Sequence, residues 1–404
     1  MGMNAGETRC VVVGGGPAGV IAALLLARRG VDVTLLEMAK DFDRDFRGDT
    51  VHASTLNVLD QIGLTEPLHA LPHEKLQGIT LQTMQRRIPI VDFRRLKTRY
   101  PYVMIMPQVA FLGFLVEQAR QYPNFHLAMN AQVVDVLRQR DRVLGVRFMQ
   151  DAEAHEMRAP LTVACDGRFS RMRKIQKLEA VSSSAPMDVG WFRLPRHADD
   201  PSSAGVFYIG SGHMLIMLAR LDAWQIGYLL PKGDFAAVRE RGLDAFRSSI
   251  SELVPWLSDR TAQVTAWHDV HLLSVKSDLL PRWHYPGLIY IGDAAHVMSP
   301  VFGVGINYAI ADAVELVNVA VDQLLGGDVT EAALGEVQRR RERPTRMIQR
   351  MQSEVQQRVV RLALSGREFD LPLIAKVALR IPRLRDVPAR IIASGFQPVR
   401  LAAV

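Results

Sequence analysis

The pattern of apolar and polar positions near the N-terminus predicts a β-α-β unit. Residues Arg9 to Val13 form a short apolar run that ends in glycines, and Val20 to Arg28 form an Ala- and Leu-rich helix. Val31 to Glu37 then has the pattern of a second buried strand. A unit of this kind favours an α/β protein with a parallel sheet.

Further apolar runs extend this pattern along the chain. Helices are predicted at Leu56 to Ile62, Phe111 to Gln121 and Gly305 to Leu325. Strands are predicted at Gln132 to Leu137, Arg142 to Phe148, Leu161 to Ala164 and Leu288 to Ile291. Between these groups the pattern changes to strands that carry aromatic residues, at Val189 to Leu194, Gly205 to Ile209, His213 to Arg220 and Trp224 to Leu230. We interpret this middle region as a separate sheet on the substrate side.

Composition supports an ordinary globular protein of 404 residues, with 48% hydrophobic and 23% charged residues. The only two cysteines, Cys10 and Cys165, lie at apolar strand-like runs, which argues against a disulfide framework and favours the cytoplasm. We expect neither a membrane-spanning segment nor a cleaved signal.

The net charge of +7 is concentrated at the C-terminal end. Residues 338–404 hold fifteen Lys and Arg against five Asp and Glu, whereas the rest of the chain holds 34 against 37. The favoured interpretation is an amphipathic helix with a solvated basic face. Contact with an anionic membrane surface is a weaker alternative, and nucleic-acid binding is disfavoured because no groove-reading motif or stacking platform accompanies the charge.

The glycine-rich turn after the first strand indicates a dinucleotide site. Gly14-Gly15-Gly16-Pro17-Ala18-Gly19 follows a strand and opens a helix, as a GxGxxG turn requires. The helix N-terminus offers free N–H groups to a pyrophosphate. Glu37 follows 18 residues after Gly19, at the end of the second strand, where a carboxylate accepts hydrogen bonds from an adenosine ribose.

A second polar feature begins where the strand Leu288 to Ile291 ends. It contains Asp293, which can accept hydrogen bonds from sugar-like hydroxyls, and then a glycine-containing turn, Gly303 to Asn307. Backbone amides at the start of the following helix can stabilise negative charge on a reduced isoalloxazine ring. A dinucleotide with a ribityl chain fits both needs, so the expected cofactor is FAD.

With the segment Asp166-Gly167-Arg168-Phe169-Ser170-Arg171-Met172-Arg173 between these two features, three signatures occur in one order. Over about residues 9–325 the chain resembles the FAD-dependent aromatic hydroxylases, the group A flavin monooxygenases typified by para-hydroxybenzoate hydroxylase. The resemblance implies an α/β fold with a Rossmann-type FAD-binding domain (1–186 and 274–330), an inserted mixed β-sheet substrate domain (187–273) and C-terminal helices (331–404).

The resemblance also implies an activity. It predicts an FAD-dependent monooxygenase that hydroxylates an aromatic or polyketide- or quinolone-like small molecule. NADH or NADPH would act as a transient reductant and O2 as co-substrate, through a flavin C4a-hydroperoxide. Transient binding of NAD(P)H is consistent with the lack of a second GxGxxG motif. Substrate identity, the choice between NADH and NADPH, and oligomeric state stay open.

The cofactor-binding residues that the resemblance implies are Gly14, Gly16, Pro17, Ala18, Gly19, Glu37, Arg47, Gln108, Asp166, Asp293, Gly303, Val304, Gly305, Ile306 and Asn307. Asp166 is implied in handling both FAD and NAD(P)H. Cys165 stands where Ala is more usual, a change that we expect to affect packing rather than chemistry.

No catalytic residue stands out, because a flavin performs the difficult bond making and the protein positions it. His52 and His213 are candidates for facing a substrate, although a structural role is favoured for both. Direct proton transfer by His296 is disfavoured, and no histidine or cysteine pattern has the spacing of a metal site. Aromatic and methionine residues on the middle strands divide between core and substrate cavity, and the sequence does not say which belong where.

Alternative functions remain at this point. One is an FAD-dependent dehydrogenase or reductase of the same fold that inserts no oxygen, and another is a non-catalytic flavin-binding or membrane-surface protein that works through its basic C-terminal region. A flavin-dependent halogenase is disfavoured because the chain has no Trp-x-Trp-x-Ile-Pro segment. Fold alone does not decide among them.

Overall fold

Short runs of consecutive apolar residues form the central sheet of the structure, a computed structural model that describes residues 4–43, 49–201, 205–366, 369–370 and 380–402. The sheet has the order β19-β20-β13-β2-β3-β9, and all its pairings are parallel except β19 with β20. Strands buried on both faces lack an alternating pattern, which explains these runs. The strands are β2 (Cys10–Val13), β3 (Val33–Leu36), β9 (Phe125–Ala128), β13 (Leu161–Ala164), β19 (His284–Tyr285) and β20 (Leu288–Tyr290).

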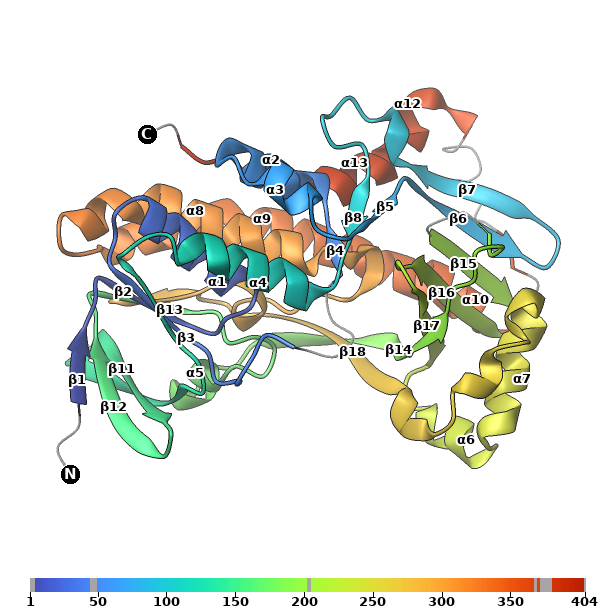
Figure 1. Cartoon of the computed structure of the whole chain (residues 1–404), viewed down its shortest axis with the longest axis horizontal. Coiled ribbons are helices and arrows are strands. Elements are labelled where there is room, and N and C mark those ends of the chain that lie inside the picture. Colours follow the sequence, from blue (N-terminus) through green and yellow to red (C-terminus); the bar gives the residue numbers. More distant parts are fainter. Residues whose placement is uncertain (1–3, 44–48, 202–204, 367–368, 371–379, 403–404) are drawn as a thin grey trace.

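The two faces of this sheet bury different neighbours (Figure 1). Val12 and Leu35 pack in one cluster with the helices α1 (Pro17–Arg28), α4 (Gln108–Ala119), α8 (Gly305–Leu325) and α9 (Glu331–Val355). Val11 and Leu36 point the other way, into a cluster with a second, four-stranded sheet. That sheet has the order β1-β12-β11-β10 and consists of β1 (Asn4–Glu7), β10 (Gln132–Gln139), β11 (Arg142–Gln150) and β12 (Glu153–Arg158).

A seven-stranded sheet stands at the opposite end of the elongated molecule (Figure 1), in the order β18-β14-β17-β16-β15-β6-β7. Its strands are β6 (Gly78–Thr83), β7 (Arg87–Asp92), β14 (Val181–Pro195), β15 (Gly205–Gly210), β16 (His213–Ala219), β17 (Ala223–Pro231) and β18 (His271–Leu279). The helices α6 (Phe235–Glu240) and α7 (Leu243–Leu253), with η2 (Pro255–Leu257), η3 (Thr261–Gln263) and η4 (Trp267–Asp269), follow β17. The α7 residues Phe246, Ile250 and Leu253 pack on one face of this sheet.

Smaller elements join the two bodies and complete the C-terminal region. A three-stranded sheet β4-β8-β5 is made by β4 (Thr50–Val51), β5 (Glu74–Leu76) and β8 (Val103–Ile105). The helical elements nearby are α2 (Ala53–Gln61), α3 (Thr65–His69), η1 (Phe93–Arg95), α5 (Arg171–Ile175), η5 (Gly292–Ala294) and η6 (Val301–Gly303). After α9 the chain continues through η7 (Gln356–Val360), α10 (Arg361–Ala363), α12 (Pro382–Arg385) and α13 (Val387–Ser394).

The α/β fold with more than one sheet and C-terminal helices confirms the predicted fold class. The seven-stranded sheet also takes β6 and β7 from residues 78–92, which the sequence patterns had left with the FAD-binding segments. The division into residues 1–186 with 274–330, 187–273 and 331–404 stays a prediction.

One helix bears on the expectation that no segment spans a membrane. Val301–Leu325 is long and apolar enough to cross a membrane by length and composition, although the sequence pattern had indicated no such segment. Two thirds of its apolar window is buried inside the protein, as in the core helix of a soluble protein. The apolar composition of α8 is explained by its place between α1 and α9.

Candidate functional site

The glycine turn between β2 and α1 brings three chain segments into close approach. Gly14 has a φ of +104°, and a Cβ there would lie 2.6 Å from the carbonyl oxygen of Cys165. A Cβ on Gly19 would lie only 2.0 Å from the carbonyl oxygen of Gly14. Gly16 stands at the N-cap of α1 and Pro17 begins the helix, with no side chain capping it. The turn therefore leaves backbone N–H groups free at a helix N-terminus, the arrangement that binds a pyrophosphate.

Glu37 lies at the mouth of this turn, as its position after β3 predicts. Its Oε2 accepts a 2.6 Å hydrogen bond from the backbone N of Gly15, and its Oε1 accepts one of 2.9 Å from Ala39. The side chain is buried. The structure thus brings Glu37 and the glycine turn together.

Asp166 lies two residues after the end of β13 and faces the same turn through its neighbour Cys165. Its Oδ1 accepts from the Ser170 hydroxyl at 2.6 Å, and its Oδ2 accepts from the backbone N of Met172 at 3.0 Å. Burial raises the pKa of the Asp166 carboxyl, although these hydrogen bonds oppose the shift. The Cys165 thiol donates weakly toward the Gly14 carbonyl at 3.6 Å, and burial raises its pKa well above the ordinary value. Cys165 is a packing residue at this contact.

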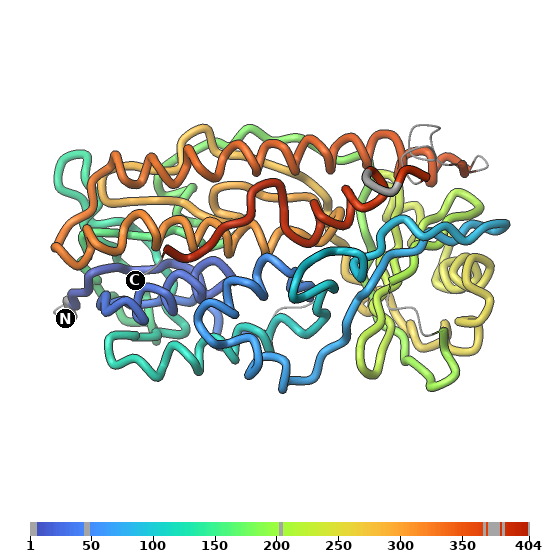
Figure 2. Tube along the Cα trace, turned by 90° about the horizontal axis from the view of Figure 1, so that it is seen from above, coloured from blue at the N-terminus to red at the C-terminus, as the bar shows by residue number. Residues whose placement is uncertain are grey.

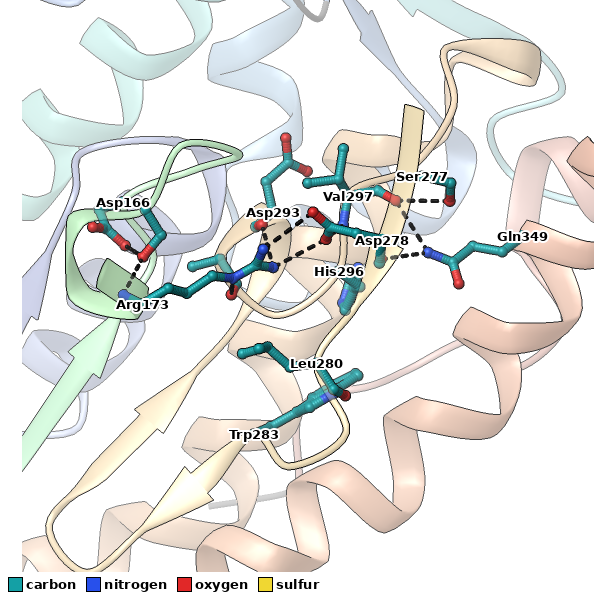
Figure 3. Close-up of polar contacts among 12 residues, drawn as sticks. Asp166, Arg173, Ser277, Asp278, Leu280, Trp283, Asp293, His296, Val297 and Gln349 are labelled. Carbon is teal, nitrogen blue, oxygen red and sulfur yellow. Dashed lines mark hydrogen bonds and ion pairs between the residues drawn. The ribbon is translucent and has the colours of Figure 1, made fainter. Parts of the chain in front are cut away.

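Arg173 ties the Asp166 segment to the loop that carries Asp293 (Figure 3). Its two Nη atoms each donate 3.1 Å hydrogen bonds to the carboxylate of Asp278 on β18, and both side chains are nearly buried. The same guanidinium donates to the backbone carbonyls of Asp293, at 3.2 Å, and of Ala294. Such a bidentate pair fixes geometry as well as charge. Asp278 in turn accepts from the backbone N of Val297 at 3.0 Å, which holds the far side of the loop.

A buried ionic cluster holds the same loop against α8 and α9. The Oδ2 of Asp312 accepts a 3.0 Å hydrogen bond from the backbone N of Gly292 and lies 2.6 Å from the Nε2 of His296. Its Oδ1 accepts from the Nε of Arg341 at 2.9 Å. Burial opposes ionisation of Asp312, but His296 and Arg341 outweigh it and lower the pKa of the carboxyl. His296 is therefore occupied in a structural contact, with Trp283 packed against its ring.

The turn Gly303 to Asn307 at the start of α8 is clasped by residues 50–55. Thr50 donates a 2.9 Å hydrogen bond to the Gly303 carbonyl. The Oδ1 of Asn307 accepts from the backbone N of His52 at 3.1 Å and from the Thr55 hydroxyl at 2.8 Å. Gly303 has a φ of +64°, and no side chain caps the N-terminus of α8. Val304, Gly305 and Ile306 complete a turn whose helix N-terminus can stabilise negative charge.

Other candidate residues lie less centrally. Gln108 is buried at the start of α4, and its backbone N donates to Asp49 at 3.4 Å. Arg47 lies outside the described residues. The Nδ1 of His213 is 2.7 Å from the Tyr228 hydroxyl, and burial lowers the pKa of His213. Since Tyr228 packs with α7, this pair lies on the side of the sheet away from the FAD-binding layers.

The seven-stranded sheet separates the aromatic residues that the sequence left unassigned. The α7 face contains Phe192, Tyr208, Met217, Trp224 and Tyr228. The opposite face, which we call the inner face, packs near Val301 of η6 and the residues of η7 and α10; it contains Leu81, Met187, Val189, Trp191, Phe207, Ile209, Met214, Ile216, Leu229 and Leu273. The inner face is therefore the one directed toward the turn Gly303 to Asn307.

One acidic cluster elsewhere brings possible metal ligands together. Among the residues that the structure describes, His197, Asp199 and Asp200 place one ligand atom each within 4.8 Å of one another. The Oδ2 of Asp200 already accepts from Trp224 at 2.7 Å and from Arg260 at 2.8 Å. We assign no metal site to this cluster.

The residues of the glycine turn and the α8 turn fit an FAD. A side chain at Gly14 or Gly19 would collide with backbone, so the cradle at the ADP end requires glycine. At the ring end, the buried Nδ2 of Asn307 has no hydrogen-bond partner within the described residues. Glu37 and Asp293 lie at the ends of β3 and β20, the edge of a parallel sheet where nucleotides bind. These site assignments stay predictions until a ligand is bound.

Four residues of the site were missed as positioning groups: Arg173, Asp278, Asp312 and Arg341. Arg341 is the hardest to find, because it lies within a run of arginines. The available signal is its spacing, since Leu334 and Ile348 stand seven residues before and after it and all three are buried. A polar residue on an apolar helical stripe marks a buried contact.

Comparison with known proteins agrees with this geometry. The family described as "FAD binding domain" matches residues 7–351. The chain is 33% identical to 6-methylpretetramide 4-monooxygenase of Streptomyces rimosus, over 98% of this chain and 94% of that protein. It is 24% identical to kynurenine 3-monooxygenase of Anopheles gambiae, over 77% of this chain and 67% of that protein.

Solved structures share the fold. The p-nitrophenol 4-monooxygenase PnpA of Pseudomonas putida superposes with a TM-score of 0.75 at 20% identity, covering 96% of this chain and 94% of that one. The anhydrotetracycline hydroxylase OxyS of Streptomyces rimosus gives a TM-score of 0.75 at 22% identity, covering 98% of this chain and 77% of that one. The predicted use of FAD with NAD(P)H and O2 is confirmed by the family and by the relatives that belong to it. The chain belongs to the FAD-binding-domain family and is a group A FAD-dependent monooxygenase.

Proposed function

We propose that the chain hydroxylates a fused-ring aromatic polyketide, of the chemical type that its 33% identical relative acts on. The observation that carries this proposal is the inner face of the seven-stranded sheet, which is apolar and contains Trp191 and Phe207. Broad, flat aromatic ligands need a wall of this kind, with few polar groups to fix orientation.

Trp191 provides the flattest part of this face. It pairs across the sheet with Gly227, and a Cβ on Gly227 would lie 3.0 Å from the Cη2 and Cζ3 atoms of the indole. The glycine thus allows the ring to lie along the strand. Offset stacking against such a ring favours a planar substrate by about 0.5–1.5 kcal/mol beyond burial alone.

The bound FAD supplies the redox chemistry, accepting hydride from NAD(P)H and activating O2. The residues of the chain bind and orient it. Glu37 and the glycine turn are assigned to the ADP portion, and Asp293 with the α8 turn to the ribityl chain and ring. Arg173, fixed by Asp278, holds the Asp293 loop through its carbonyls. The uncapped N-terminus of α8 favours negative charge on the reduced ring.

We place the transient nicotinamide dinucleotide beside Asp166, on the surface formed by Phe169 and Lys276. The Phe169 side chain is 61% exposed, and the Lys276 Nζ stands 5.7 Å from its ring centroid. An exposed ring can stack with a base, and an adjacent ammonium can pair with a phosphate. Phe169→Ala is expected to raise the KM for NAD(P)H while the FAD content of the purified protein stays unchanged.

The experiment that tests the proposal measures O2 uptake, NAD(P)H oxidation and product together. With a tetracycline-type phenolic precursor we expect one hydroxylated product per O2 consumed. Reduction of the substrate without O2 uptake would instead identify a reductase of the same fold. NAD(P)H oxidation that yields only hydrogen peroxide with every polycyclic phenol, but product with a small phenol, would contradict the substrate class.

We place the enzyme in the cytoplasm, which its two free, buried cysteines support. Contact of the basic C-terminal region with anionic membranes is expected to be weak, because arginines of α9 and η7 pair with nearby glutamates. The pairs are Arg339 and Arg340 with Glu336, Arg340 with Glu315, Arg346 with Glu342 and Arg358 with Glu354. Cosedimentation with anionic liposomes at low and high salt measures this contact, and salt-resistant binding would contradict our expectation.

A further inference from the structure

The C-terminal strap, which we define as residues 387–402, runs across helices that carry the cofactor site. It begins as α13 and continues as extended chain to the end of the described residues. In Figure 2 the dark red strap runs back along the molecule toward its N-terminal half. Ala389, Ile392 and Ala393 form the buried face of α13, and Val399 is buried beyond the helix.

The outer end of the strap is held through its backbone. Gln61 at the end of α2 accepts from the backbone N of Leu401 at 3.0 Å and donates to its carbonyl at 3.5 Å. Asn318 on α8 donates to the Arg400 carbonyl at 2.8 Å and accepts from the backbone N of Ala402 at 2.9 Å. Two side-chain amides therefore pair with the strap as a neighbouring strand would, independently of the side chains that the strap carries.

The inner end of the strap meets His52. The Nδ1 of His52 lies 2.6 Å from the Ile392 carbonyl, and the ring is 1% exposed. Because a carbonyl only accepts, Nδ1 must carry the proton and donate. The backbone N of the same residue donates to Asn307 at 3.1 Å. His52 therefore contacts the strap through its Nδ1, and the α8 turn through its main chain and through its ring beside the Gly303 backbone.

The α8 turn depends on this clasp on both of its sides. Thr50 reaches the Gly303 carbonyl, and a Cβ on Gly303 would lie 2.9 Å from the Thr50 hydroxyl oxygen. Thr55 shares the Asn307 oxygen with His52. Since His52 is also the N-cap residue of α2, movement of its ring would shift the start of α2 and the clasp together.

We propose that the C-terminal strap is a positioning element for the turn Gly303 to Asn307, and that His52 is the residue through which it acts. The proposal rests on the placement of the flavin ring at this turn. With the strap in place the turn is already ordered, so FAD binds without the cost of ordering it. In this proposal His52 acts on the cofactor through the turn, as a positioning residue.

The test compares FAD with ADP, which engages only the glycine turn and Glu37. His52→Phe keeps an aromatic ring and removes the N–H donor, so the Kd of the apoprotein for FAD should rise about tenfold. The Kd for ADP should stay unchanged. His52→Asn places an amide nitrogen where Nδ1 stands and should restore FAD affinity to within about threefold of the wild type.

Two further variants test the outer contacts of the strap and provide a histidine control. Gln61→Ala combined with Asn318→Ala frees the outer end of the strap and should weaken FAD binding in the same direction but less. His126→Phe replaces a histidine that is 56% exposed and should change neither Kd. Thermal unfolding of each apoprotein is the control that checks whether the variants are folded.

Three results would overturn the inference. An unchanged FAD Kd in His52→Phe would show that the strap does not act on the turn, and equal losses of FAD and ADP affinity would show a general loss of fold. Asp293→Ala tests the placement of the cofactor independently of the strap. This variant should lose FAD affinity and keep ADP affinity. If Asp293→Ala binds FAD normally, the placement of the cofactor fails and the strap inference fails with it.

Discussion

The parallel sheet and the seven-stranded sheet of this monooxygenase use their sequences in different ways. In our proposal the parallel sheet recognises its ligand mainly with backbone, at Gly14 and at Gly19, where any side chain would meet a carbonyl oxygen. The seven-stranded sheet presents side chains, and Trp191 and Phe192 point to opposite faces although they are adjacent. Backbone recognition demands glycine and is visible in a sequence, whereas side-chain recognition depends on which face becomes the cavity.

The largest expected effect is at the backbone cradle. Gly19→Val places a Cβ within 2.0 Å of the Gly14 carbonyl oxygen, so the turn must rearrange. We expect apoprotein and a loss of about 4 kcal/mol or more in the free energy of unfolding. Flavin absorbance per mole of protein and urea unfolding measure the two effects. Gly113→Ala is the control, because a Cβ there meets nothing within 4 Å, and it should keep its FAD.

The buried ion pair between the two sheets is expected to come next. Asp278→Leu leaves Arg173 buried without its carboxylate, which should lower the free energy of unfolding by about 3–5 kcal/mol. The double variant Arg173→Met with Asp278→Leu should recover part of this loss, since no unpaired charge remains. Denaturant unfolding of the three variants measures the coupling, and a double variant as unstable as the sum of both single variants would contradict it.

A matched pair of truncations distinguishes the roles of the two faces of the seven-stranded sheet. Phe192→Ala opens a cavity under α7 and should lower the free energy of unfolding by about 3–5 kcal/mol, with kcat/KM unchanged. Trp191→Ala should raise the KM for a polycyclic substrate and increase NAD(P)H oxidation without hydroxylation. Steady-state kinetics and product analysis distinguish the two. Equal kinetic effects of both variants would show that the assignment of the inner face is wrong.

The smallest expected effect is a pH dependence at His52. Burial lowers the pKa of His52 from 6.5 to about 4. Between these two pH values His52 is therefore mostly protonated in the unfolded chain and mostly neutral in the folded chain. The free energy of unfolding should therefore fall by about 3 kcal/mol as pH falls to 4, and little of this loss should occur above 6.5. The difference between the wild-type and His52→Asn curves isolates this contribution. Parallel curves would contradict it.

Regular elements were predicted well where both ends carry a signal. The helix Gly305 to Leu325 is found with the predicted bounds, because Gly305 begins it and Gly326-Gly327 ends it. β13 also has its predicted bounds. By contrast β14 begins at Val181, and its Ser182 to Ser184 segment has no apolar pattern and becomes a strand only by pairing with β18.

The sequence predicted the backbone turn of the site but not the side chains that position it. Glu37 meets the glycine turn as its spacing predicts, because both lie at the ends of adjacent parallel strands. Asp278 contacts the Asp293 loop, and Arg341 contacts Asp312, which holds that loop; both contacts arise only through tertiary packing. His52 and His213 hydrogen-bond with Ile392 and Tyr228, and the structural role that was favoured for both stays a prediction.

The hairpin of β6 and β7 limits how this enzyme can be recombined with its relatives. β15 lies beside β6 in the seven-stranded sheet, so that sheet is assembled from two distant stretches of the chain. A chimera that exchanges only residues 187–273 would pair β15 from one protein with β6 from another. Mismatched side chains there would expose an unpaired sheet edge, which invites aggregation. Transfer of substrate preference between relatives therefore has to move residues 78–92 along with the larger insert.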